Sequence, residues 1–172
     1  MDADAPDGGF DALSPDSGRE RVVVGVGGGE ATINALRFAY EEALERDATL
    51  DAVLVRAQPV VMADPLGVAA TVGTEVSASE AAARLDLLLR EALGDAADDE
   101  RITRTILDGD PVKQLCAESQ GAAMLVVGAA TGLQRWLPGS VARLCEAKSP
   151  AAVVVVRKDT QVIPRRGRRR AE

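Results

Sequence analysis

The segment that most constrains the fold is residues 21–26, Arg-Val-Val-Val-Gly-Val, an apolar run without polar alternation. A strand that exposes one face alternates apolar and polar residues, whereas a strand of a parallel sheet is buried on both faces. Three glycines follow at 27–29, and from Ala31 the apolar residues change to helical spacing. The run therefore predicts a buried parallel strand followed by a helix.

The same alternation of strand and helix signals continues along the chain. The predicted strands are 21–26, 50–55, 102–107, 124–127 and 151–156, and the predicted helices begin at 31, 75, 111 and 140. Residues 58–74 contain two prolines and two glycines and are interpreted as one long loop. Strands separated by helices predict βαβ units with right-handed crossovers. The expected fold is a single doubly wound α/β domain, Rossmann-like, with a five-stranded parallel sheet and helices on both faces.

The two ends of the chain differ from this body in composition. Residues 1–20 are acidic and rich in Gly, Pro and Ser, and residues 164–172 hold five arginines. We predict a disordered acidic tail over 1–20, the α/β domain over 21–158 and a disordered basic tail over 159–172. The basic tail could instead contact phosphate or an acidic surface.

Composition removes several classes of function. The chain has no histidine, which excludes Ser-His-Asp and Cys-His catalytic sites and His-ligated metals. Cys116 and Cys145 are too few for a four-cysteine zinc site; they are interpreted as buried inert thiols, with a redox role as the alternative. A net charge of −7 argues against nucleic-acid binding. Neither a membrane-spanning run nor a signal peptide is visible, so we expect a cytoplasmic protein. From the composition we expect no catalytic residues and no metal-binding residues.

Two glycine-bearing loops are the candidate ligand site. In open α/β sheets, ligands bind beyond the carboxyl ends of strands, where the strand order reverses. Residues 25–32 follow the first strand and residues 128–140 follow the fourth. Gly139 and Ser140 suit a helix start that binds an anion, although Gly-Ser is also an ordinary helix cap. A dinucleotide fingerprint fails at Glu30 or Thr32, and neither loop has the lysine of a P-loop.

Taken together, residues 21–157 resemble the universal stress protein family. The resemblance rests on VVVGVGGGEATINALRFAYEEA, on ILDGDPVKQLCAESQGAAMLVVGA and, most specifically, on GLQRWLPGSVARLCEAKSPAAVVVV. It implies strand order 3-2-1-4-5, with the reversal between the first and fourth strands. It also implies a homodimer, paired through the last strand at Val153, Val154, Val155 and Val156.

The resemblance also carries a nucleotide motif, Gly-x-x-Gly, nine residues, then Gly-Ser/Thr. In this chain, the stretch between the second glycine of the motif and the closing Gly-Ser pair is about two residues short. Val55 matches a position of the family that packs on adenine. Gly27 stands where nucleotide-binding members have Asp, Gly29 replaces a serine, and Ala123 replaces a second Asp. The implied nucleotide-binding residues are Gly27, Val55, Gly128, Gly132 (or Thr131), Gly139, Ser140 and Val141.

These departures decide the expected function. Loss of the Asp removes a charged hydrogen-bond partner, so we expect ATP binding to be weak or lost. The expected function is a dimeric stress-response module and not an enzyme. The alternatives are an ATP- or AMP-binding sensor and a weak ATPase; no cofactor is required, and ATP or AMP is the possible ligand. Arg135 and Arg143 could contact phosphate, and Trp136 either stacks on a base or plugs its loop. Residues 58–74 form either a lid or a variable connection.

Overall fold

A computed structural model describes residues 18–56, 60–63, 65–67, 69–72, 76–130 and 140–159 of the 172-residue chain. Most of the two predicted tails, and residues 131–139 of the second candidate loop, lie outside these described residues.

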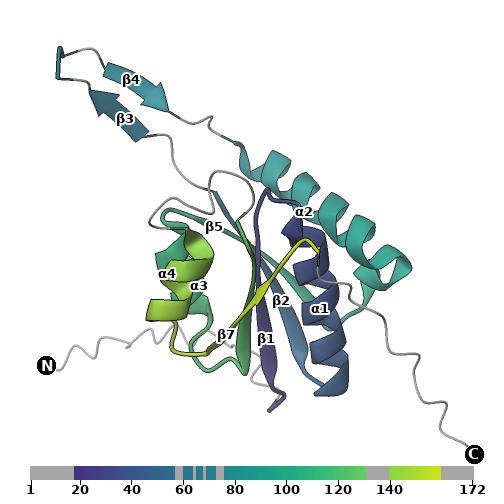
Figure 1. The fold of residues 1–172 in the computed structure, drawn as a ribbon. Coiled ribbons are helices and arrows are strands. Elements are labelled where there is room, and N and C mark those ends of the chain that lie inside the picture. Colours follow the sequence, from purple (N-terminus) through teal and green to yellow (C-terminus); the bar gives the residue numbers. More distant parts are fainter. Residues whose placement is uncertain are drawn as a thin grey trace, which may run out of the picture.

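The central feature is a five-stranded parallel sheet in the order β5-β2-β1-β6-β7 (Figure 1). Its strands are β1 (Arg21–Val26), β2 (Thr49–Arg56), β5 (Ile102–Asp108), β6 (Met124–Gly128) and β7 (Ala152–Val156). Counted along the chain without the two short strands described below, this is the order 3-2-1-4-5. The predicted fold class and strand order are therefore confirmed.

Helices cover both faces of the sheet, as predicted (Figure 1). One face carries α1 and α2 and a short 3₁₀ helix, and the other carries α3 and α4. The helices are α1 (Ala31–Glu45), α2 (Ala78–Leu93), α3 (Pro111–Glu118) and α4 (Val141–Lys148), and the 3₁₀ helix spans Gly94–Asp98. In the described part of the chain, no helix is both long and apolar enough to cross a bilayer.

β1 shows why its sequence lacks polar alternation. Val22, Val24 and Val26 belong to the core beneath α1 and α2, whereas Val23 belongs to the core beneath α3 and α4. Each of these four residues is at most 6% exposed. Both faces of the strand are therefore apolar because two separate helical layers cover it.

The proline and glycine content of residues 58–74 predicts one long loop, but the structure has two short strands there. Two short strands, β3 (Val60–Ala63) and β4 (Ala69–Val72), pair antiparallel, with Val60 opposite Val72. The turn between them contains Pro65 and Gly67, and Gly67 has φ +82°. Proline and glycine thus mark one tight turn here, and the uncharged stretches on either side of it form the strands.

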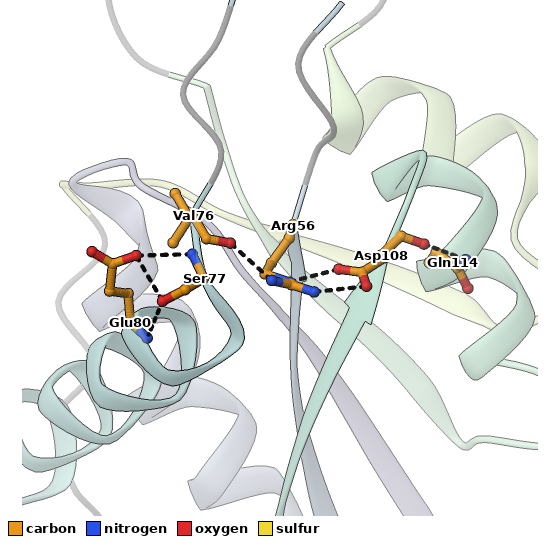
Figure 2. Close-up of polar contacts among 6 residues, drawn as sticks. All are labelled: Arg56, Val76, Ser77, Glu80, Asp108 and Gln114. Carbon is orange, nitrogen blue, oxygen red and sulfur yellow. Dashed lines mark hydrogen bonds and ion pairs between the residues drawn. The ribbon is translucent and has the colours of Figure 1, made fainter.

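Arg56 ties together the two ends of the segment that contains β3 and β4 (Figure 2). Arg56, the last residue of β2, donates from Nε and Nη2 to the two carboxylate oxygens of Asp108, over 2.6 and 2.7 Å. Its Nη1 donates to the carbonyl of Val76 over 2.8 Å. Gln114 of α3 in turn donates to the carbonyl of Asp108 over 2.9 Å. Arg56 therefore holds residue 76 next to residue 56, across the whole intervening segment.

α2 begins three residues later than the apolar pattern predicts. Ser77 is its N-cap: the hydroxyl accepts from the backbone N–H of Glu80, and the Glu80 carboxylate accepts from the backbone N–H of Ser77 (Figure 2). This reciprocal capping box sets the start of α2 at Ala78.

We expect a double-mutant cycle on Arg56 and Asp108 (Arg56→Met, Asp108→Asn) to give a coupling energy near 1 kcal/mol in urea unfolding. Two parallel hydrogen bonds between a guanidinium and a carboxylate lie at the upper end for partly exposed pairs. Arg90 and Asp98 provide the control, since that pair is longer, at 3.2 Å, and both side chains are about 60% exposed. Equal coupling in the two cycles would contradict this assignment.

Candidate functional site

A cavity of about 490 Å³ opens at the carboxyl ends of β1, β2 and β6. Its walls come from the turn after β1, the start of α1, the end of β2, the first turn of α3, residues 127–130, and the start of α4. The loops that follow β1 and β6 therefore face one cavity, where the strand order reverses between neighbouring strands.

Thr32 holds the glycine turn after β1 in place. Its hydroxyl donates to the carbonyl of Gly27 over 3.2 Å, and its backbone N–H donates to the carbonyl of Gly29 over 3.0 Å. Thr32 itself is buried, at 4% exposed. The turn that lines the cavity is thus fixed by the first turn of α1.

The glycines around the cavity meet different constraints. A Cβ at Gly128 would lie 3.2 Å from the carbonyl carbon and the Cβ of Ala31, so a side chain there would press on the backbone of α1. A Cβ at Gly27 would meet only Thr32 Oγ1, at 3.9 Å. Gly128 is therefore tightly packed against α1, whereas the position of Gly27 has room for a side chain.

Electrostatically, the cavity offers backbone dipoles in place of charged side chains. None of the described residues that line it carries a charge. Two helices, α1 and α4, begin at its wall, and neither has a side-chain hydrogen bond from its N-cap residue, Glu30 or Ser140. The first N–H groups of a helix lack intrahelical partners and carry partial positive charge. The site can therefore hold an apolar ring against Val53 and Val55 and a polar or anionic group near these amides.

The structure brings together five of the seven predicted site residues. Gly27, Val55, Gly128, Ser140 and Val141 all line the cavity. The other two, Gly132 and Gly139, lie outside the described residues, as do Thr131, Arg135 and Trp136. Arg143 is exposed on α4 and is not a lining residue.

One wall of the cavity is absent from the predicted site. Pro111 and Leu115 of α3 line it, whereas the glycine pattern points only to the loops after β1 and β6. Gly25 is the residue from which the α3 wall could have been predicted. A Cβ there would lie 2.9 Å from Leu115 Cδ1, and a glycine inside a buried strand marks the close approach of another element. The preceding Asp110 caps α3 by accepting from the backbone N–H of Lys113 over 2.8 Å.

Comparison with known proteins identifies related folds. A model of the universal stress protein family matches residues 18–157, and no curated protein matches. A universal stress protein solved with cAMP is 23% identical, covering 81% of this chain and 98% of its own, with a TM-score of 0.58. Lactobacillus plantarum UspA is 17% identical, covering 80% and 97%, with a TM-score of 0.53. An Archaeoglobus fulgidus universal stress protein with dAMP is 19% identical, covering 80% and 97%, with a TM-score of 0.50.

The packing contrast between two cavity glycines is testable. We expect Gly128→Ala to lower the free energy of unfolding by about 1–2 kcal/mol, because the added methyl group presses on the backbone of α1. Gly27→Ala, the matched control, should leave it within about 0.5 kcal/mol, because the position is open. Urea unfolding followed by circular dichroism measures both values. Equal loss in the two variants would show that close packing does not explain Gly128.

Proposed function

Because a family model matches most of its length, the chain belongs to the universal stress protein family, and we propose that it is a dimeric stress-response module with a degenerate nucleotide pocket. In this proposal ATP or AMP binds weakly or not at all, and no cofactor is required. The observation that carries it is the cavity lining, which contains no charged residue among the described positions.

Gly27 is the position at which the loss of charge matters most. It lines the cavity at the end of β1, where the family resemblance leads one to expect an aspartate. A hydrogen bond to a charged group contributes about 1.5–3 kcal/mol. Its loss corresponds to a roughly ten- to hundredfold weaker affinity. In this proposal the cavity lacks one polar anchor of a nucleotide pocket.

Nucleotide sensing is the second candidate, and one observation favours it. Val53 and Val55 form an apolar wall, and the uncapped starts of α1 and α4 supply N–H groups at the same cavity. A base and a phosphate group would find complementary surfaces there. Two of the structural relatives contain cAMP and dAMP. The two candidates differ only in affinity, so one titration separates them.

We expect calorimetry to give a dissociation constant near or above millimolar for ATP and for AMP. Gly27→Asp should tighten nucleotide binding about tenfold, because it restores a charged acceptor where a side chain fits. Gly27→Asn is the matched control, since it has the same size without the charge. Micromolar affinity in the unaltered protein, or nucleotide released from purified protein on denaturation, would contradict the degenerate site and support the sensor.

The proposed dimer rests on β7. This strand is at the edge of the sheet, and its residues Ala152–Val156 carry no charge. Its valines pack inward: Val153 and Val155 contact one core, and Val154 and Val156 belong to or contact the other. An uncharged edge strand presents unpaired backbone groups that another chain can match. Pairing of two β7 strands about a twofold axis would cover both edges.

We expect sedimentation velocity to show a dimer and Ala152→Lys to shift the equilibrium toward monomer. Ala152 is exposed at the start of β7, and a lysine at an edge strand opposes pairing. Ala83→Lys, on the exposed side of α2, serves as the control with the same change in charge. A monomer at every concentration, or equal effects of the two lysines, would contradict pairing through β7.

A further inference from the structure

Two cysteines meet where α3 packs against α4, on the face of the sheet that carries these helices. Cys116 lies in α3 and is partly exposed, whereas Cys145 lies in α4 and is fully buried; both are free thiols. Both belong to or contact the same apolar core cluster. Burial, together with the neighbouring Cys116 thiol, raises the pKa of Cys145 to about 12.

A hydrogen bond between two serines fixes how α3 and α4 face each other. Ser119 follows Cys116 by three positions, and Ser149 follows Cys145 by four, so in each helix the pair shares one side. The hydroxyl oxygens of these serines are 2.9 Å apart, and Ser119 is fully buried. The sides of α3 and α4 that carry the cysteines are therefore turned toward each other, one helical turn away from this bond.

We propose that Cys116 and Cys145 form a reversible disulfide that links α3 to α4 when the protein encounters a peroxide. Partly exposed Cys116 reacts first. Its sulfur attacks one oxygen of hydrogen peroxide, the O–O bond breaks, and the other oxygen leaves as water with the thiol proton, which converts Cys116 to a sulfenic acid. The sulfur of Cys145 then attacks the sulfur of Cys116, the S–O bond breaks, and the hydroxide departs as a second water with the Cys145 proton. This is the slow step, because burial keeps the Cys145 thiol protonated. The two sulfurs lose two electrons in total, and the peroxide gains them.

The disulfide would bear directly on the cavity. Leu115 precedes Cys116, and Ala142 lies one turn before Cys145; both line the cavity. A bond between the two cysteines therefore joins two of its walls just behind the lining. This inference does not depend on the proposed function, because it concerns bond formation within the chain, whatever the cavity holds.

The direct test is mass spectrometry of the reduced full-length chain before and after exposure to hydrogen peroxide, with free thiols then alkylated by N-ethylmaleimide under denaturing conditions. Reduced protein should take up two maleimides. Oxidised protein should take up none, should be lighter than unlabelled reduced protein by two hydrogen atoms, and should regain both thiols with dithiothreitol. Trypsin should release residues 114–135 linked to residues 144–148.

Variants and stability supply the controls. Cys116→Ser and Cys145→Ala should each abolish the linked peptide, and peroxide should raise the urea midpoint of the unaltered protein alone, because a cross-link limits the unfolded chain. Oxygen added to Cys116 while Cys145 still reacts with maleimide would overturn the proposal. Disulfide-linked dimers in place of the internal bond would also overturn it. If a variant fails to fold, the masses of the unaltered protein still decide the question.

Discussion

Burial of β1 on both faces is the constraint on which the rest of the structure depends. The strand lies at the centre of the sheet, with β2 on one side and β6 on the other. Its alternate valines reach two separate cores, so neither helical layer can be removed without exposing it. Because β1 is also where the strand order reverses, the turns after β1 and β6 leave the sheet side by side and open between them. The cavity is thus a result of strand order.

Much of this arrangement follows from the sequence, and the reasons are local. Buried parallel strands read as uninterrupted apolar runs, and Pro111 marks the first turn of a helix in a way that does not depend on tertiary contacts. Gly128 stands where β6 approaches the backbone of α1 at Ala31, whereas the positions of Gly27 and Gly29 are open. These signals sufficed for the fold class, whereas the strand order and the five cavity residues were predicted through the family resemblance.

The features that the sequence pattern did not predict have different causes, and only one of them depends on a partner far along the chain. The hairpin of β3 and β4 lies in a stretch whose prolines and glycines suggest a loop, and its strands of four residues are too short for a clear period. The α3 wall of the cavity requires knowing that Leu115 packs on Gly25. The start of α2 could have been read from Ser77 and Glu80, whose spacing is that of a capping box.

The bond between Arg56 and the carbonyl of Val76 has a consequence for how this chain can be altered. It closes the base of the hairpin between the last residue of β2 and a residue just before α2, so the domain does not rely on the hairpin to hold positions 56 and 76 together. Within the described residues, β3 and β4 pair only with each other. This base is therefore a natural grafting point, where a segment of different length or chemistry can be exchanged while the scaffold below keeps its shape.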